Sequence, residues 1–196
     1  MPASPHRKRL RRFHEPGDLH ELTFATYRGL KLLEDEDRVI WLAEAIDAAG
    51  ERSGCDLVAY VFMPDHVHLL VRPTGDQKAD ISRFLKLTKG PFARRVHRHA
   101  ADTALDLVER LTVRERPGKS CFRFWQEGAG YDRNLRTPAA IGASIDYLHA
   151  NPVRRGLCDR PTDWRWSSAR FYADDGVSAD GRDSPRITRL PFGVLQ

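Results

Sequence analysis

The sequence predicts an α+β fold, a ferredoxin-like sandwich with one antiparallel sheet. Stretches typical of strands and stretches with apolar residues at helical spacing follow in the order strand, helix, strand, strand, helix, strand, with an extra helix at the end. The turn signal Pro64-Asp65 separates the second strand from the third and favours an antiparallel pair. We expect these two strands to form the centre of the sheet. A chain of 196 residues fits one domain with tails.

The first half of the chain is expected to hold three strands and one helix. Residues 19–27, "LHELTFATY", alternate and are rich in Thr and aromatic residues, which predicts a strand. Residues 35–54 repeat apolar residues at helical spacing between an acidic start and Gly54, which predicts a helix. The stretches 55–64 and 66–73 are the two strands on either side of the turn.

The second half begins with another helix. It is predicted over 79–100, with an interruption at Gly90-Pro91, because proline removes a hydrogen bond from a helix interior. The polar, Arg-rich stretch 101–120 shows no pattern that assigns an element. Residues 121–137 begin as a strand and continue into a glycine-bearing turn.

The last predicted helix lies within 137–157 and has clear signals at both ends. Thr137 is a suitable cap, and Pro138 stands at the first helical position. Asn151-Pro152 is expected to end the helix.

Composition indicates a globular protein. Hydrophobic residues make up 41% and charged residues 30% of the chain, the apolar runs are short, and the N-terminus is basic rather than signal-like. We therefore expect a cytoplasmic protein with no membrane partner, and the three scattered cysteines suggest reduced thiols. A flexible basic arm is expected at 1–15, one folded domain at 16–173 and a loosely ordered tail at 174–196.

Positive charge is concentrated in two segments, although the net charge is only +5. One lies in the N-terminal arm and the other in the helix predicted at 79–100: Arg7, Lys8, Arg9, Arg11 and Arg12, then Arg83, Lys86, Lys89, Arg94, Arg95 and Arg98. Such clusters favour binding to a polyanion such as nucleic acid. The alternative is that both are solvated faces.

The stretch "MPDHVHLLV" places His66 and His68 two residues apart on a predicted strand, so both side chains project from the same face. Two imidazoles in this arrangement can share a divalent cation. For an isolated pair of this kind, ordinary surface or core histidines are the commoner explanation, and a metal needs at least one more ligand.

A further ligand is available on the last helix. Tyr147 and Asn151 are four residues apart and share a helical face. The Asn151 carbonyl oxygen suits a hard cation such as Mg²⁺ or Mn²⁺. Taken singly, Tyr147 fits a core aromatic residue and Asn151 fits a helix cap before Pro152.

Together these motifs resemble a known family, the REP-associated tyrosine transposases, which belong to the single-tyrosine HUH superfamily. The matching pieces are "MPDHVHLLV", "FRFWQEGAGYDRNLR", "IDYLHANPVRRGL" and "DWRWSSAR", and the resemblance covers about residues 13–172. It implies a catalytic domain at 16–173 in which His66, His68 and Asn151 hold Mg²⁺ or Mn²⁺ and Tyr147 is the nucleophile. Many relatives have Gln at the Asn151 position, whereas REP-associated members typically have Asn.

The resemblance also implies an activity. In this family the tyrosine attacks a phosphodiester of single-stranded DNA, which forms a 5′-phosphotyrosine and frees a 3′-hydroxyl, and a second 3′-hydroxyl later rejoins the strand. The substrates are hairpins of palindromic repeat elements, so a nucleoid-associated protein is expected, acting as a monomer or homodimer.

Other candidate residues follow from charge, aromaticity and position. Tyr131, in the glycine-bearing turn, is the rival nucleophile. Asp65 could orient a histidine, or could simply be a turn residue after Pro64. The candidate DNA-binding residues are Arg83, Lys86, Lys89, Arg154 and Arg155. The aromatic residues Phe124, Trp125, Trp164 and Trp166 could stack on bases, or simply pack in the core. No general base stands out.

Two further functions compete with the transposase. One is a hairpin-binding module or repressor without catalysis, for which the His66, His68, Tyr147 and Asn151 set would be superfluous. The other is a small metal-dependent hydrolase that uses the two histidines with a carboxylate, which would leave Tyr147 without a role.

Overall fold

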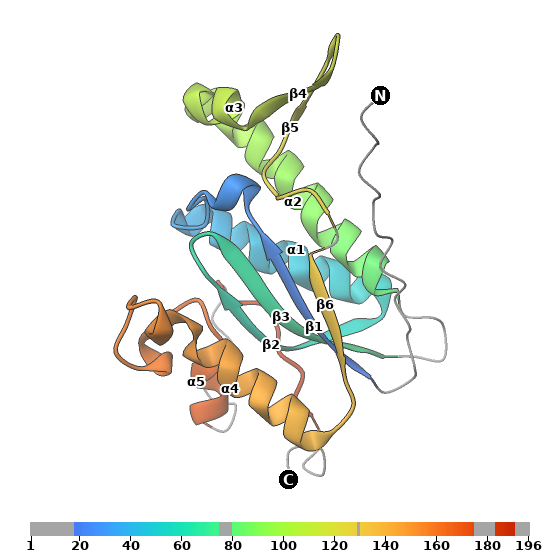
Figure 1. Cartoon of the computed structure of the whole chain (residues 1–196), viewed down its shortest axis with the longest axis vertical. Coiled ribbons are helices and arrows are strands. Elements are labelled where there is room, and N and C mark those ends of the chain that lie inside the picture. Colours follow the sequence, from blue (N-terminus) through green and yellow to red (C-terminus); the bar gives the residue numbers. More distant parts are fainter. Residues whose placement is uncertain (1–17, 75–79, 129, 175–182, 191–196) are drawn as a thin grey trace, which may run out of the picture.

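A computed structural model describes residues 18–74, 80–128, 130–174 and 183–190. Its centre is a four-stranded antiparallel sheet in the order β2-β3-β1-β6, shown in Figure 1. The strands are β1 Leu19–Ala25, β2 Cys55–Phe62, β3 His66–Pro73 and β6 Tyr131–Leu135. With helices packed on both faces, this confirms the predicted α+β sandwich of ferredoxin-like type.

The order of the strands corrects one expectation. The hairpin of β2 and β3 forms as predicted, but β2 lies at the edge of the sheet and β1 takes its place beside β3 in the centre. The reason is that β1 pairs on both sides, with β3 at Thr23–His68 and with β6 at Thr23–Tyr131. Such pairing between distant segments leaves no mark in the local pattern of either strand.

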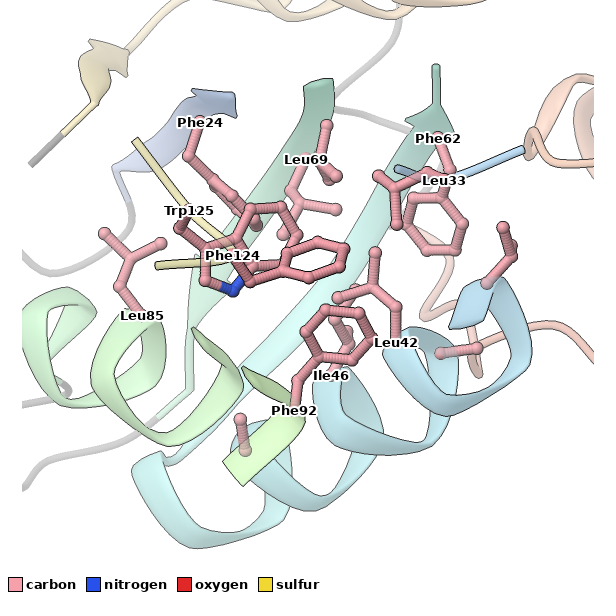
Figure 2. Packing of buried hydrophobic residues seen from close by; sticks show 14 of the residues in the cluster. Phe24, Leu33, Leu42, Ile46, Phe62, Leu69, Leu85, Phe92, Phe124 and Trp125 are labelled. Atoms are coloured by element: carbon pink, nitrogen blue, oxygen red, sulfur yellow. The ribbon is translucent and has the colours of Figure 1, made fainter. Parts of the chain in front are cut away.

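Two helices cover one face of the sheet, and a third covers the other (Figure 1). The first two are α1 Glu36–Ser53 and α2 Ile81–Thr103, and the third is α4 Pro138–Arg154. The main core lies between the sheet and the first two helices, where Leu42, Phe84 and Phe92 are almost fully buried. Figure 2 shows this packing around Phe92, Phe124 and Trp125. A smaller cluster joins α4 to the opposite face.

The helix ends follow the sequence signals. Asp35 caps α1 by accepting a hydrogen bond from the Arg38 N–H, and Gly54 ends it in the left-handed conformation with φ of 66°. Thr137 caps α4 through the Ala140 N–H, and Pro138 occupies the first turn, both as predicted.

Two expected proline effects do not occur. Helix α2 continues without a break through Gly90-Pro91, and α4 continues through Pro152 to Arg154. A proline in a helix loses one backbone hydrogen bond, but buried contacts can hold the helix together. Phe92 in α2 and Pro152 in α4 are both buried, which explains why tertiary packing outweighs the local signal here.

The Arg-rich stretch that the sequence left unassigned folds into a short helix and a ribbon. Helix α3 Leu105–Leu111 leads into β4 Thr112–Arg116, which pairs with β5 Lys119–Phe122. In Figure 1 this ribbon projects away from the main sheet.

The segment that follows α4 runs along the open side of β2. The Phe62 N–H donates to the Trp166 carbonyl, and the Ser168 N–H donates to the Tyr60 carbonyl. The 3-10 turn Pro161–Asp163 and the short helix α5 Ala169–Ala173 stand before and after these contacts.

Part of the expected C-terminal tail also packs on the domain. Residues 183–190 are described, and in them Leu190 is buried while the Thr188 N–H donates to the Leu57 carbonyl. The arm at 1–15 and the remaining tail after Asp174 lie outside the described residues. None of the helices in the described parts is long and apolar enough to span a membrane.

Candidate active site

The alternation of the strands gathers polar side chains on the face of the sheet that α4 covers. In β3, Val67 and Leu69 point into the main core, so His66 and His68 point to the opposite face. The register across the strands then aligns His68 of β3 with Thr23 of β1.

The two imidazoles lie close together, and each is held by a hydrogen bond at Nδ1. Their ring centroids are 4.8 Å apart. His68 Nδ1 is 2.8 Å from Thr23 Oγ1, and His66 Nδ1 is 2.6 Å from Asp65 Oδ1. These contacts leave Nε2 of both rings as the atoms for a shared ligand. The contact of Asp65 with His66 corresponds to one of the two roles that the sequence allowed for Asp65.

The surroundings favour a neutral His68. Burial, followed by the charge of the neighbouring His66, lowers the pKa of His68 to about 4. A neutral imidazole at pH 7 is the form that binds a metal. At Asp65, burial favours the protonated form, but the hydrogen bond and charge of His66 and the Arg155 guanidinium outweigh it and lower the pKa of the carboxyl group.

Tyr147 on α4 faces the histidines. Its ring centroid is 6.2 Å from that of His68, with the rings nearly perpendicular, and the residue is 45% exposed. The Arg154 guanidinium lies 5.0 Å above the Tyr147 ring. The phenol therefore lies near the imidazoles and remains accessible.

Asn151 follows one turn later on α4 and is largely buried. Its amide nitrogen donates to the Tyr147 and Leu148 carbonyls at 2.9 and 3.4 Å, and neither bond uses its amide oxygen. Among the described residues, no cluster of three or more His, Cys, Asp or Glu side chains could hold a metal. A cation at His66 and His68 therefore requires a ligand of another type, such as this amide oxygen.

The end of α4 is tied to the turn before β3. Arg155 Nη2 donates to Asp65 Oδ2 at 2.8 Å, while the other oxygen of Asp65 contacts His66. Arg154 and Arg155 therefore contact different parts of the site. The Arg154 guanidinium stacks over the Tyr147 ring, and Arg155 forms an ion pair with Asp65.

A pocket of about 500 Å³ opens between the sheet and α4. Three of the residues that line it were predicted from the sequence as candidate site residues: His68, Tyr131 and Tyr147. The sequence did not predict the others, which are Glu21, Thr23, Arg133, Ala143 and Ser144. Both candidate nucleophiles, Tyr131 and Tyr147, therefore lie in the same pocket. A signal for Glu21 was present, because an acidic residue stands amid the apolar residues of a predicted strand.

Gly130 explains why Tyr131 enters this pocket. Its φ is +73°, and a Cβ atom at this position would lie 2.2 Å from the Thr23 carbonyl oxygen. Only glycine therefore allows β6 to begin so close to β1. The next residue, Tyr131, then pairs with Thr23 across the two strands.

The other predicted contact residues lie apart from the pocket. Arg83 and Lys86 are exposed on α2, on the opposite side of the sheet from the histidines. Lys89 Nζ lies 5.4 Å from the Phe24 ring centroid.

The four aromatic candidates are occupied in packing or backbone contacts. Phe124 and Trp125 are buried in the main core, as the packing alternative expected. Trp164 Nε1 donates to the Phe62 carbonyl, and Trp166 packs partly buried against the main core.

Comparisons with known proteins agree with these motifs. Residues 19–110 match the model of a family described as "Transposase IS200 like". A curated Haemophilus influenzae protein that carries the name of a REP-associated tyrosine transposase is 28% identical over 127 residues, which are 61% of this chain and 65% of that relative. The match thus spans slightly less than two thirds of the relative's length.

A solved structure with a TM-score above 0.5 shares the fold. A REP-associated tyrosine transposase bound to a REP hairpin matches with a TM-score of 0.64 and 20% identity, over 94% of this chain and 95% of that one. A transposase structure from Deinococcus radiodurans matches with a TM-score of 0.42 and 25% identity, over 73% and 96% of the two chains.

Proposed function

This chain is similar to the REP-associated tyrosine transposases, and from that premise we propose that it cleaves and rejoins single-stranded DNA through a covalent bond to Tyr147. The observation that carries the proposal is the accessible Tyr147 phenol, in one pocket with His68 and 6.2 Å from it between ring centroids. A binding module alone would not require this combination.

The proposed reaction is an exchange of phosphodiester bonds. The Tyr147 oxygen attacks a phosphorus atom of the strand, its proton leaves, and the bond from phosphorus to the 3′-oxygen breaks as that oxygen gains a proton. The strand is then held as a 5′-phosphotyrosine. Attack by a second 3′-hydroxyl releases Tyr147 and forms a new phosphodiester, so no nucleotide cofactor is consumed.

The donor set fits a hard divalent cation, with His66, His68 and Asn151 as the residues that would hold Mg²⁺ or Mn²⁺. The Nδ1 contacts with Thr23 and Asp65 orient both rings, which leaves each Nε2 for the ion. When bound, such an ion supplies positive charge to a phosphate oxygen and aligns the phosphorus for in-line attack.

Arginines beside the pocket complete the proposed contacts with the strand. Arg154 stacks on the Tyr147 ring, so its guanidinium is near the phosphate that the phenol would attack. Arg83, Lys86 and Lys89 would bind phosphates farther along the DNA, on the other side of the sheet. A hairpin with a single-stranded flank is the proposed substrate, because the solved relative named above is bound to a REP hairpin.

The test uses such an oligonucleotide with Mg²⁺ or Mn²⁺, followed by a denaturing gel. We expect a protein–DNA adduct that is lost in Tyr147→Phe and kept in Tyr131→Phe, the matched control from the same pocket. His66→Ala should abolish cleavage and leave hairpin binding largely intact.

Other outcomes would contradict the proposal. Hydrolysis without an adduct would indicate a metal-dependent hydrolase. Tight binding with intact DNA in every condition would indicate a binding module, and an adduct that depends on Tyr131 instead would move the nucleophile to that residue.

A further inference from the structure

The pocket beside Tyr147 contains an ion pair, Glu21 and Arg133, that has no role in the reaction proposed above. Glu21 of β1 is buried, and Arg133 Nη2 of β6 donates to its Oε2 at 2.7 Å. Ser144 of α4 donates to the same oxygen at 3.1 Å. Glu21 and Arg133 are directly paired across the two strands, so both backbones hold this contact in place.

The ion pair of Glu21 and Arg133 leaves N–H donors of the Arg133 guanidinium at the surface of the pocket. A buried carboxylate is costly unless it is paired, and Arg133 provides the counter-charge for Glu21. The Arg133 side chain nevertheless remains 51% exposed. A guanidinium has five N–H donors in a planar fork that matches phosphate, and the bond to Glu21 involves only the Nη2 end.

An exposed aromatic ring stands two residues before it. Tyr131 is 52% exposed, and it lines the same pocket as Arg133 and Tyr147. A large exposed aromatic side chain beside an arginine is a suitable stacking surface for an unpaired base. Since residues two apart on a strand share one face, Tyr131 and Arg133 present a ring and a cation side by side.

We propose that Tyr131 and Arg133 form a subsite for the nucleotide next to the scissile phosphate, in which the ring of Tyr131 stacks on its base and Arg133 binds its phosphate. The subsite rests on the proposed function, because it assumes that Tyr147 attacks a single strand. Glu21 and Ser144 are positioning residues that hold the guanidinium at the pocket wall.

The first experiment measures binding of a hairpin with a single-stranded flank by fluorescence anisotropy, with all variants in a Tyr147→Phe background to prevent cleavage. Arg133→Gln should weaken binding about 10-fold or more, the effect of losing a charged hydrogen bond. The control is Arg136→Gln, since Arg136 also pairs with a buried carboxylate, Asp18, but lies outside the pocket lining. That control should change binding less than about 2-fold.

Tyr131 gives a second contrast. Tyr131→Ala should weaken binding about 5-fold or more, while Tyr131→Phe should bind like the parent, because stacking needs the ring and not the hydroxyl. A hairpin without the flank should bind equally to all these variants. Equal loss in Tyr131→Ala and Tyr131→Phe would overturn the stacking role.

The phosphate contact is identified by replacing one flank phosphate at a time with an uncharged methylphosphonate. At the phosphate next to the scissile one, the parent should lose affinity and Arg133→Gln should lose little more, because the partner is already absent. Similar losses in both proteins at every position would overturn the contact. If Arg133→Gln proves unfolded by circular dichroism, Arg133→Lys replaces it, and a loss smaller than 10-fold but above the Arg136→Gln level is then expected.

The two proposals can fail separately. An adduct with Tyr147 together with unchanged binding in the Arg133 and Tyr131 variants would remove the subsite and keep the reaction. The binding contrasts without any adduct in the Tyr147 protein would remove the reaction and keep a nucleotide site.

Discussion

The two faces of the central sheet differ in kind, although the same strands build both. Towards α1 and α2, Leu22, Val67 and Leu69 are completely buried in an apolar core. Towards α4, neighbouring residues of the same strands, Thr23 and His68 among them, line an open polar pocket. Because the side chains of a strand alternate with a period of two residues, each strand contributes to the core on one face and to the pocket on the other. Substitutions one residue apart should therefore separate effects on stability from effects on the pocket.

The largest expected effect is on the core face. Leu69→Ala should lower the free energy of unfolding by about 2–5 kcal/mol, because the side chain is fully buried and its removal leaves a cavity. Urea denaturation measures this. The adjacent His68→Ala is the variant for comparison, and it should lower the free energy of unfolding less, since the His68 side chain is on the pocket face. A loss below about 1 kcal/mol for Leu69→Ala would show that the core face tolerates cavities and would break the comparison.

A smaller effect, on metal affinity, is expected where a strand residue orients one of the histidines. Thr23→Val removes the hydrogen bond to His68 Nδ1 and should weaken Mn²⁺ binding about 10- to 100-fold, since the ring loses its orientation. Isothermal titration calorimetry measures the affinity. Thr103→Val, which removes a hydroxyl bonded to a carbonyl on the far end of α2, should bind Mn²⁺ normally. Equal affinities in the two variants would contradict the support role.

Acid should destabilise the protein through buried neutral histidines on the α4 side. Burial lowers the pKa of His149 to about 4 from its ordinary 6.5, and its Nε2 contacts Ser168 Oγ at 2.7 Å. Between these two values the unfolded chain binds a proton that the folded chain does not, so stability is full above pH 6.5 and falls as the pH drops toward 4. His68, whose pKa is also lowered, contributes in the same direction.

The measurement is urea unfolding at pH 7 and pH 5. His149→Gln should reduce the stability difference between the two pH values by about 1–2 kcal/mol relative to the parent. An unchanged difference would mean that folding does not lower the pKa of His149.

The smallest effect is expected far from the pocket. Lys86→Ala on α2 should change stability by less than about 0.5 kcal/mol, because the residue is exposed. If Lys86 binds a phosphate, the slope of log affinity against log salt should fall by about 0.7–0.9. Arg52→Ala, at the end of α1, is the control. Identical slopes for both variants would remove α2 from the proposed DNA contacts.

Local features of the sequence were sufficient for part of this structure. Alternation in "HVHLLV" correctly predicted that His66 and His68 share a face, and the caps at Thr137 and Gly54 correctly predicted helix ends. These features depend on neighbours in the chain, so the sequence carries them directly.

Features that depend on distant pairing were not predictable in the same way. The central position of β1 arises from its contacts with β3 and β6, and only this arrangement brings Tyr131 and Arg133 beside Tyr147. The continuity of α2 through Pro91 likewise reflects burial of Phe92 rather than local propensity. Long-range packing decided each of these outcomes.

The segment along β2 has a consequence for how copies of the chain can meet. Outward groups of β2 are occupied: Trp166 accepts from Phe62, Ser168 bonds to Tyr60, and Tyr172 donates to the Val58 carbonyl. An exposed strand edge can pair with a strand of another molecule and so lead to aggregation. The segment that follows α4 occupies the edge of the apolar strand β2 and thereby prevents such pairing there. A second molecule could extend the sheet at the β2 edge only after residues 166–168 had moved away from Tyr60 and Phe62.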